Sequence, residues 1–470
     1  MSNLTNLRTR LSQHGQSHLL HWWDELNESQ RCGLLDQLES IDYSLIARLF
    51  SEREAAGGSS ASELAGRATP PAQLVAQPKT AAEQAHWQKA TACGEEQLRD
   101  GKVGAILVAG GQGTRLGFDK PKGMFPIGPV SERSLFQIFC EQLLARGRRA
   151  GAVIPYFIMT SDATHDDTVA FFEKNHFFGL KPRDVYFFRQ GKLPAVCDKT
   201  GQIHLAEKHE VALSPDGHGG ILKALQAAGL LEVMRDRGIE SLYYHQVDNP
   251  MAIVCDPAFL GLHELHESDI STKVVNKVAP EEKTGLLVNV DGQTQIIEYS
   301  DMPVERTREV ESDGTLRFRA GNTAMHVIRR GFLQELVDQG RDLPYHRAHK
   351  PVPCVDRLGN RIETTPTVKN AFKFEQFIFD TLPLAATALV VEADRSIEFN
   401  PVKNQSGADS PETSRQAISR LSRDWLRTAG AEVSSAARVE ISPLFALDAD
   451  ELSGRVSPGQ QFLDGAILRP

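Results

Sequence analysis

A glycine-rich turn in this chain carries residue types that suit the binding of phosphate. The apolar run 103–108 leads without a break into glycines at 110, 111, 113 and 117. Small residues let the backbone turn sharply and bring its N–H groups close to an anion. An aliphatic run of this kind is typical of a strand buried on both faces of a parallel sheet. The sequence therefore predicts a phosphate-binding loop at the end of a buried strand.

Cations follow the turn at close spacing, which suits a polyphosphate. Arg115 and Lys122 lie within a few residues of the glycines. A Walker A loop needs Lys-Ser/Thr after its last glycine, where this chain has Phe118-Asp119, and a dinucleotide fingerprint needs a glycine in place of Leu116. The spacing therefore excludes both of these common phosphate loops.

Two later segments place further polar groups beside predicted strands and helices. Asp248 follows the strand-like run 241–247 and could hold Mg2+, which takes only one or two carboxylates besides water and substrate phosphates. The turn 216–220 precedes a helix that is expected to open at Ile221, so its free N–H groups would face an anion or a base edge. Both segments point to a ligand cleft at the carboxyl ends of the strands.

The elements that must position these residues alternate between strand and helix from residue 102 onward. Strands are expected in VGAILVA, VIPYFIMT, DVYFF and SLYYHQV, and helices at 134–146, near 166–174 and at 220–237. This order predicts right-handed crossovers and a mostly parallel sheet with helices on both faces. The stretch 285–299 then changes to a period of two around Asp291-Gly292, which predicts a hairpin with a primed turn.

The two ends of the chain have other patterns. Residues 1–55 show apolar residues at helical spacing, 57–78 reads as a connecting segment, and 83–99 returns to a helical pattern. After about residue 396 we expect a small C-terminal domain of mainly short strands. The predicted domains are an N-terminal helical segment with its linker (1–100), a catalytic domain (101–395) and the C-terminal domain (396–470).

Composition limits the classes of function. The 470 residues suffice for two or three domains, and a formal charge of -9 argues against a nucleic-acid partner. Six cysteines without a CxxC pair indicate reduced thiols and a cytoplasmic setting, and the chain shows neither a leader nor an apolar stretch long enough to cross a membrane. His263, Glu264 and His266 lack zincin spacing and are expected on a solvated helix.

The arrangement GGxGTRLG followed by PKGM resembles the signature of the nucleotide-sugar pyrophosphorylases. It is most similar to the eukaryotic-type UDP-N-acetylglucosamine (UDP-N-acetylhexosamine) pyrophosphorylases of the UDP-sugar pyrophosphorylase family. The resemblance extends over nearly the whole chain, from QHGQSHLLHWWDEL to PETSRQAISRL. It implies an α/β nucleotidyltransferase fold that is Rossmann-like and GT-A-like, with a mostly parallel mixed sheet, an N-terminal helical segment and a small C-terminal domain.

The resemblance also implies roles for particular residues. Catalysis falls to Arg115, Lys122, Asp248 and Lys403, the last from a PVKN segment similar to the family's PLKN, with Mg2+ on Asp248. Nucleotide binding falls to Gly110, Gly111, Gln190, Gly217 and His218. An amide such as that of Gln190 offers both a donor and an acceptor, as the imide edge of uracil requires.

A sugar pocket is implied by several segments in the family's order. Its residues are Gly285, Glu298, Tyr299, Asn322, Phe377 and Phe379. Carboxylate and amide groups suit hydroxyls and an acetamido N–H, and aromatic faces suit a methyl group and a sugar ring. His218 departs from the family, which usually has Asn there, whereas relatives specific for UDP-glucose more often have His.

The expected reaction is transfer of uridylyl from UTP to N-acetylglucosamine 1-phosphate, which gives UDP-N-acetylglucosamine and pyrophosphate. The expected partners are therefore UTP, a sugar 1-phosphate, a UDP-sugar and pyrophosphate. A UDP-glucose or broad-specificity UDP-sugar pyrophosphorylase is the nearer alternative, favoured by His218. A regulator that binds nucleotide sugars without turnover is the remote one.

Overall fold

The computed structural model describes residues 2–52, 59–362 and 368–470, and its contacts define two compact units. Unit 1 comprises residues 1–63, 190–221 and 342–380, and unit 2 comprises residues 64–189, 222–341 and 381–470. This division differs from three consecutive domains, because the N-terminal helices share a buried core with two later stretches of chain.

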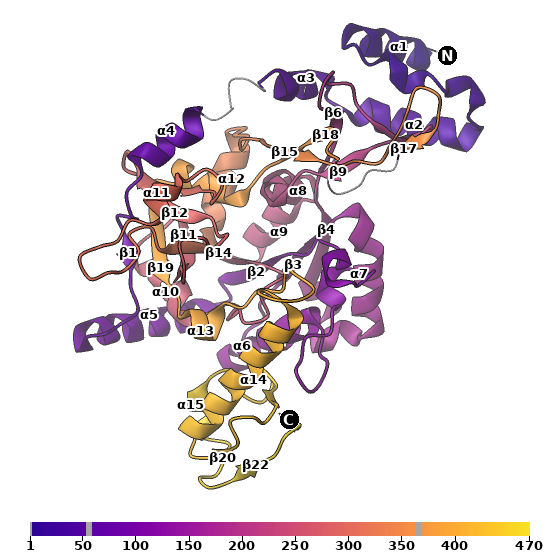
Figure 1. Ribbon diagram of the computed structural model, residues 1–470. Helices are drawn as coiled ribbons and strands as arrows, with labels where there is room; N and C mark the ends of the chain where they lie inside the picture. Colours follow the sequence, from indigo (N-terminus) through magenta and orange to yellow (C-terminus); the bar gives the residue numbers. More distant parts are fainter. Residues whose placement is uncertain (1, 53–58, 363–367) are drawn as a thin grey trace. The chain divides into compact units, whose positions relative to one another are not determined.

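Unit 2 is built on a mixed, mostly parallel sheet (Figure 1). The expected α/β fold with a mostly parallel sheet is confirmed. From one edge to the other the strands are β1 (Leu74–Val75), β19 (Ala388–Glu392), β11 (Ile270–Asn276), β14 (Ala320–Arg329), β10 (Ser241–Gln246), β2 (Val103–Val108), β3 (Tyr156–Thr160) and β4 (Val185–Arg189). Only β14 among these is antiparallel to its neighbours.

A hairpin is attached to this sheet through β14. Strands β12 (Leu286–Val290) and β13 (Gln293–Ile297) pair around Asp291-Gly292, whose φ angles are 52° and 87°. Two consecutive positive φ angles are those of a type I′ turn. The predicted hairpin is confirmed.

Of the helices expected between the strands of unit 2, two are confirmed and one is divided in the structure. α6 (Leu135–Ala150) begins after Ser134, whose hydroxyl accepts from Gln137 N at 3.1 Å, and α7 (Asp162–Lys174) follows β3. The single helix expected at 220–237 is wrong, because the chain forms α8 (Ile221–Ala227) and α9 (Leu230–Asp236). Gly229 separates them in the left-handed conformation, with φ of 65°.

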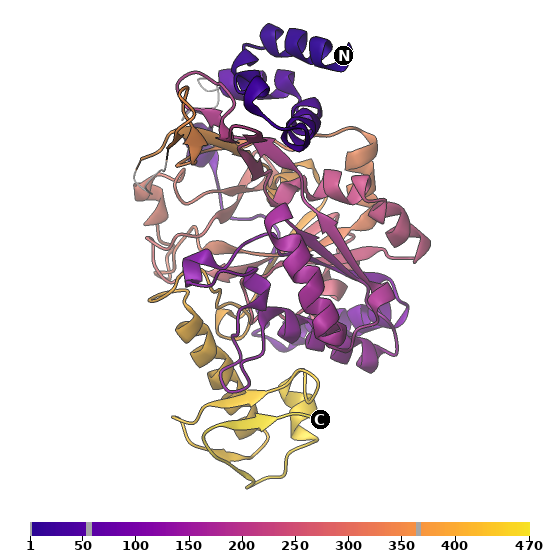
Figure 2. The ribbon, with the colours of Figure 1, turned by 90° about the vertical axis from the view of Figure 1, so that its right-hand side faces the viewer.

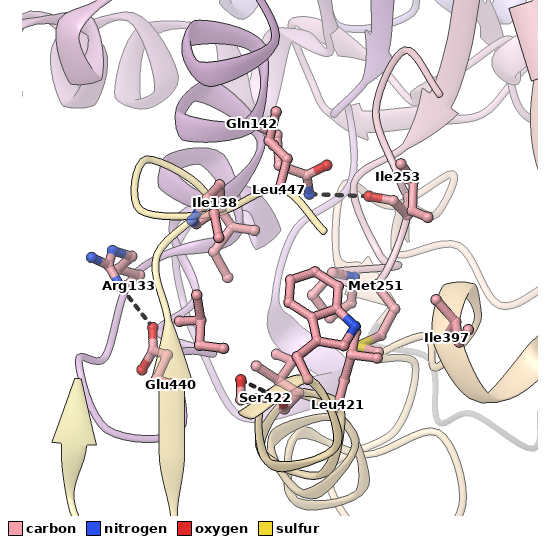
Figure 3. A pocket seen from close by; sticks show the side chains of 17 residues that line it. Arg133, Ile138, Gln142, Met251, Ile253, Ile397, Leu421, Ser422, Glu440 and Leu447 are labelled. Carbon is pink, nitrogen blue, oxygen red and sulfur yellow. Dashed lines mark hydrogen bonds and ion pairs between the residues drawn. The ribbon is translucent and has the colours of Figure 1, made fainter. Parts of the chain in front are cut away.

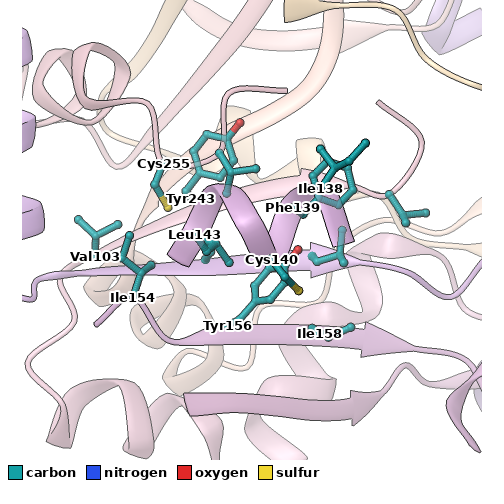
Figure 4. Close-up of a cluster of buried hydrophobic side chains, with 14 of the residues drawn as sticks. Val103, Ile138, Phe139, Cys140, Leu143, Ile154, Tyr156, Ile158, Tyr243 and Cys255 are labelled. Carbon is teal, nitrogen blue, oxygen red and sulfur yellow. The ribbon is translucent and has the colours of Figure 1, made fainter. Parts of the chain in front are cut away.

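The main core lies between α6 and the sheet (Figure 4). Phe139 and Leu143 of α6 pack with Tyr156 and Ile158 of β3, and all four side chains are at most 1 % exposed. Because β2 and β10 are buried next to them, the loops that follow these strands start from a rigid base.

Two helices on unit 2 approach each other at backbone distance. These are α5 (Ala81–Arg99), which confirms the helix expected at 83–99, and α10 (Pro257–Leu265). A Cβ at Gly94 would lie 1.9 Å from Pro257 O, and one at Gly261 would lie 1.7 Å from Ala90 O. The expectation of a solvated His263 on α10 is wrong: this ring is 2 % exposed and its Nδ1 lies 2.8 Å from Ser271 Oγ.

The segment expected as a connection at 57–78 contains regular structure. Its first two residues, 57 and 58, lie outside the described ranges, but α4 (Ser59–Arg67) and the edge strand β1 follow. β1 pairs in parallel with β19, a partner more than three hundred residues later in the chain, so no local pattern announces it.

The C-terminal part begins with the long helix α14 (Pro411–Thr428), which the sequence reading did not anticipate (Figure 2). The short strands expected after it are present as β20 (Glu432–Val433), β21 (Val439–Ile441), β22 (Gln461–Phe462) and β23 (Ala466–Leu468), with α15 (Ala449–Ser453) between them. A buried ion pair joins this part to the rest of unit 2, because Arg133 Nη1 lies 2.9 Å from Glu440 Oε1 (Figure 3).

Unit 1 consists of helices packed on small sheets. The helices are α1 (Ser2–Gln13), α2 (Glu28–Ser40) and α3 (Tyr43–Ser51), and the strands are β5 (Lys192–Pro194), β6 (Val196–Cys197), β7 (Leu205–Glu207), β8 (Glu210–Val211), β9 (Leu213–Pro215), β15 (His346–Lys350), β16 (Cys354–Val355), β17 (Arg361–Ile362) and β18 (Ala371–Glu375). Leu11 and Leu34 share one buried cluster with Val196 and Phe372. Within the described ranges of both units, no helix combines the length and apolar character needed to span a membrane.

Candidate active site

The glycine-rich turn after β2 forms a compact loop held by its own backbone. Gly113 N donates to Lys120 O at 2.9 Å, and Lys122 N donates to Gly111 O at 3.1 Å. A Cβ at Gly113 would lie 2.8 Å from Phe118 O, so the close return of the chain requires glycine there. Gly111 is exposed, with open space where a Cβ would stand. The loop therefore presents accessible backbone at Gly111.

Asp248 follows β10 beside this loop. β10 and β2 are parallel neighbours, with Gln246 opposite Val108, and Val247 N donates to Val108 O at 3.1 Å. The segments that follow the two strands therefore leave the sheet at the same edge. Asp248 is half-buried, and no described residue donates a hydrogen bond to its carboxylate or forms an ion pair with it.

Lys403 reaches the same region from a distant part of the sequence. Val402 N donates to Asp248 O at 2.7 Å, which fixes the backbone of the PVKN segment against the end of β10. Lys403 N donates to Asp409 O at 2.7 Å, while the lysine side chain is exposed. The fold thus brings Asp248 and Lys403 together, as the sequence reading expected of residues that share a site.

Four predicted catalytic residues lie close enough to interact electrostatically, and we call them the charged cluster: Arg115, Lys122, Asp248 and Lys403. Burial lowers the pKa of Lys122, attraction to the Asp248 carboxylate opposes this, and repulsion from Lys403 and Arg115 lowers the pKa further. Within the described part of the chain none of these three cations has an ion-pair partner, whereas Lys120 Nζ lies 3.3 Å from Asp167 Oδ2. Unpaired cations of this kind can bind polyphosphate.

Three predicted sugar residues also meet in unit 2. Asn322 N donates to Gly285 O at 2.8 Å, and a Cβ at Gly285 would lie 3.3 Å from Glu298 Oε1. Asn322 Oδ1 accepts from Ala324 N at 3.0 Å, which orients its amide. Tyr299 follows Glu298 in sequence, but its residue surface is 44 % exposed. The carboxylate, the amide and the glycine expected in the pocket therefore lie together.

In unit 1 the two segments expected to read the base lie side by side. β5 and β9 pair antiparallel, and Asp216 N donates to Gly191 O at 3.0 Å, which sets Gln190 close to Gly217. Gly217 has φ of 85°, and a Cβ there would lie 2.4 Å from Gln376 O. The expectation of free N–H groups in this turn holds only in part, because Gly219 N donates to Gln376 O at 2.8 Å.

His218 belongs to an aromatic cluster with His346, Phe377 and Phe379. Its ring centroid lies 5.2 Å from that of Phe377 and 5.7 Å from that of Phe379, and His346 stacks on Phe377 at 4.5 Å. Burial, with a smaller contribution from His346, lowers the pKa of His218 to about 4. Ile378 N donates to His218 Nδ1 at 3.2 Å, so the neutral ring carries its proton on Nε2.

The predicted site residues thus divide between the units. Gln190, Gly217, His218, Phe377 and Phe379 lie in unit 1, and the other ten lie in unit 2: Gly110, Gly111, Arg115, Lys122, Asp248, Gly285, Glu298, Tyr299, Asn322 and Lys403. The sequence reading missed His346, for which no local pattern exists. It also missed Asn249, although this residue stands inside the VDN segment that drew attention to Asp248.

A metal site built from protein ligands alone is absent from the described residues, because no three His, Cys, Asp or Glu side chains are grouped to hold an ion. All six cysteines are free in the structure.

Comparison with known proteins identifies relatives over nearly the whole length. Residues 66–450 match the family of UTP–glucose-1-phosphate uridylyltransferase. The chain is 36 % identical to human UDP-N-acetylhexosamine pyrophosphorylase-like protein 1, over 92 % of this chain and 87 % of the human one. It is also 36 % identical to the UDP-N-acetylglucosamine pyrophosphorylase of Saccharomyces cerevisiae, over 96 % and 97 % of the two chains.

Among solved structures, the UDP-N-acetylglucosamine pyrophosphorylase of Trypanosoma brucei in complex with an inhibitor matches with a TM-score of 0.83. That match has 26 % identity and covers 97 % of this chain and 95 % of the other. With the family model, the relatives and this structure in agreement, the chain belongs to the UTP–glucose-1-phosphate uridylyltransferase family of nucleotidyltransferases.

Proposed function

We propose that this protein transfers uridylyl from UTP to N-acetylglucosamine 1-phosphate and releases pyrophosphate. The observation that carries the proposal is the charged cluster of unit 2, near the ends of β2 and β10, where Lys122 interacts electrostatically with Asp248, Lys403 and Arg115. None of these four side chains has an ion-pair partner among the residues that the structure describes. Such a group of charges suits a triphosphate with its metal ion far better than a neutral ligand. The names of the relatives, UDP-N-acetylglucosamine pyrophosphorylases among them, supply the choice of nucleotide and sugar.

The reaction needs no covalent intermediate on the protein. An oxygen of the sugar phosphate attacks the α-phosphorus of UTP, a new P–O bond forms, and the bond between the α-phosphorus and the bridging oxygen to the β-phosphate breaks as pyrophosphate departs. Catalysis then consists of positioning and neutralisation of charge. We assign Arg115 and Lys122 to the pyrophosphate side and Lys403 to the sugar phosphate, with the exposed backbone of Gly111 and its neighbour Gly110 against the nucleotide.

The residues present fit a divalent cation, which the family uses and which we propose to be Mg2+. The Asp248 carboxylate has no protein partner among the described residues and lies near the unpaired cations. Magnesium keeps water and takes only one or two carboxylates besides phosphate oxygens, so one aspartate suffices. When bound, the ion would neutralise negative charge on the phosphates.

We assign the other residues to sugar or base binding from the chemistry of their side chains, for each unit separately. In unit 2, Gly285, Glu298 and Asn322 would contact the sugar, with Tyr299 beside them. In unit 1, Gln190 and Gly217 would recognise uracil, whereas His218, Phe377 and Phe379 would discriminate between sugars.

A second substrate, glucose 1-phosphate, is favoured by the presence of His218. We give preference to the N-acetylated sugar because the neutral ring, with its proton on Nε2, offers one N–H donor as an asparagine amide would. The imidazole therefore replaces the carboxamide as a donor. The proposed cytoplasmic location and the absence of a nucleic-acid partner stay predictions from composition.

A panel of sugar 1-phosphates with UTP and Mg2+, followed by pyrophosphate release, tests the proposal. We expect kcat/KM for N-acetylglucosamine 1-phosphate to exceed that for glucose 1-phosphate by roughly tenfold or more, the scale of one filled apolar subsite and one paired N–H. His218→Asn should widen the preference. A better rate with glucose 1-phosphate would replace the hexosamine assignment with the UDP-glucose one, and absence of pyrophosphate release with every sugar would remove the proposed reaction.

A further inference from the structure

Asn249, the residue after Asp248, is 3 % exposed and bonds three backbone groups with one amide. Its Nδ2 donates to Glu398 O at 2.7 Å. Its Oδ1 accepts from Asn400 N at 3.1 Å and from Met251 N at 3.3 Å. The amide therefore ties the loop after β10 to the segment that leads to Lys403, two stretches that are far apart in the sequence.

The same two stretches are joined a second time at their outer ends. Lys273 of β11 is 1 % exposed. Its Nζ donates to Asp256 Oδ2 at 2.7 Å and also donates to the carboxylate of Glu398. Burial alone would lower the pKa of Lys273, but attraction to the two carboxylates raises it, so the lysine stays charged. Asp256 ends the loop that begins at Asp248, and Glu398 begins the segment that reaches Lys403.

We infer that Asn249 is a positioning residue that sets the separation between Asp248 and Lys403. The inference rests on the proposed function, in which these two residues serve the metal and the sugar phosphate. In this inference Asn249 contacts neither the metal nor the sugar phosphate. It acts by fixing the backbone of both segments, together with the hydrogen bond from Val402 N to Asp248 O at 2.7 Å. The bonds of Ser414 Oγ to Asn400 O at 2.7 Å and to Asn400 Oδ1 at 3.0 Å support the segment from α14.

Only an amide meets the hydrogen-bonding demand at this position. An aspartate would accept from both N–H groups but would turn a carboxylate oxygen toward Glu398 O, and a leucine of similar size would leave all three backbone groups without a partner. A displacement of about 1 Å between catalytic groups can cost about a hundredfold in rate. A purely structural role would not require the hydrogen bonds of Asn249 to join the two segments that carry Asp248 and Lys403.

Gln142 of α6 supplies a matched control (Figure 3). Its Nε2 donates to Ala252 O at 3.0 Å and its Oε1 accepts from Val254 N at 2.9 Å, so it holds the same loop through two backbone bonds. In the described part of the chain its side chain forms no hydrogen bond with residues 398–403. Gln142→Ala therefore loosens the loop without loosening its connection to Lys403.

The test measures kcat, the Mg2+ concentration at half-maximal rate and the KM of each substrate for Asn249→Ala and Gln142→Ala in the full-length protein. For Asn249→Ala we expect kcat to fall by about a hundredfold, the half-saturating Mg2+ concentration and the KM for sugar 1-phosphate to rise, and little further loss when Lys403→Ala is added. For Gln142→Ala we expect less than about a threefold loss of kcat. If Asn249→Ala does not fold, Ser414→Ala takes its place, with an expected loss of several-fold that is also non-additive with Lys403→Ala.

Equal losses for the Asn249 and Gln142 variants, or full additivity with Lys403→Ala, would overturn the positioning role and leave the proposed function intact. Near-normal turnover of Asp248→Asn and Lys403→Ala themselves would overturn the proposed function, whatever the result at Asn249.

Discussion

The charged cluster of unit 2 and the aromatic cluster of unit 1 use opposite physical means. In the charged cluster, Arg115, Lys122 and Lys403 have no ion-pair partner among the described residues, and the loop residues there are largely exposed. In the aromatic cluster, His218 is packed among rings, and its pKa is lowered to about 4, so it is neutral. The charged cluster can attract a ligand over a long range, whereas the aromatic cluster can bind one only through close contact and fit of shape.

Because of this difference, the charged cluster suits acceleration of the reaction and the aromatic cluster suits selection of the substrate. Unpaired charges attract any polyphosphate and gain most from the charge that develops during reaction, so they suit rate. A neutral donor held between rings discriminates between ligands through shape and one hydrogen bond, so it suits selectivity. Substitutions should therefore separate the two clusters: turnover should depend on the first, and the choice of substrate on the second.

The largest effect is expected at the carboxylate. Asp248→Asn should lower kcat by at least about a hundredfold, because an amide cannot neutralise a metal ion and one electrostatic contribution of this kind is typically worth that much. The measurement is pyrophosphate release at saturating substrate. Asp167→Asn, which removes the partner of Lys120, should change the rate little. Near-normal turnover of Asp248→Asn would remove the charged cluster from catalysis.

The next largest effect on the rate is expected when Lys122, which has no ion-pair partner among the described residues, is removed. Removal of Lys120, which lies in the same loop and pairs with Asp167, serves as the comparison. Lys122→Ala should lower kcat by tens of fold, whereas Lys120→Ala should cost less than about threefold. Thermal unfolding should show little loss of stability for Lys122→Ala, because burial of this lysine already disfavours its charge. A large drop in Tm for Lys122→Ala, with the rate preserved, would assign the lysine to the fold instead.

A smaller effect is expected in unit 1. Gln190→Ala should reduce the preference for UTP over CTP by roughly tenfold, because the imide edge of uracil loses a side-chain partner. The ratio of the two kcat/KM values measures this. Lys192→Ala, two residues along the chain on β5, serves as the control and should leave the ratio unchanged. If Gln190→Ala keeps the full preference, backbone groups alone read the base.

The smallest effect concerns stability and pH. An unfolded histidine has a pKa near 6.5, whereas that of His218 in the folded chain is about 4. Between these two values the unfolded chain takes up a proton that the folded chain refuses, so the free energy of unfolding falls as the pH falls through this window. His218→Asn removes this contribution.

Chemical denaturation at pH 7 and pH 4.5 measures the difference between the two proteins. The variant should lose less stability than the unmodified protein over this interval, by on the order of 1 kcal/mol. All other titrating groups are common to both proteins, so the comparison reports on the ring of His218 together with its electrostatic coupling to His346. Equal losses would mean that the ring is already protonated in the folded state near pH 4.5.

Local patterns predicted β2, β3, β4 and β10 of the central sheet and the loops at its edge, because buried parallel strands read as unbroken apolar runs. The break at Gly229 was missed, since a glycine within a helical pattern is often tolerated. The buried His263 was also missed, because its partner Ser271 lies on a neighbouring strand that no helix pattern reveals.

The candidate site shows the same limit. Residue types and family motifs predicted Asp248, Lys122 and Lys403, and the fold brings them into one neighbourhood. The sequence could not predict which cations stay unpaired, nor the amide of Asn249 that joins two distant segments, because both depend on tertiary contacts. The low pKa of His218 likewise depends on rings contributed by residues far from it in the chain.

The discontinuous make-up of unit 1 has a consequence for biosynthesis. Its core joins leucines of the first three helices, such as Leu11 and Leu34, to Phe372 and Phe374. On a ribosome that adds roughly 5 to 20 residues per second, the N-terminal helices would emerge on the order of 15 to 60 s before these phenylalanines. During that interval their apolar faces lack their final partners, so the nascent chain presents a natural binding surface for a co-translational chaperone.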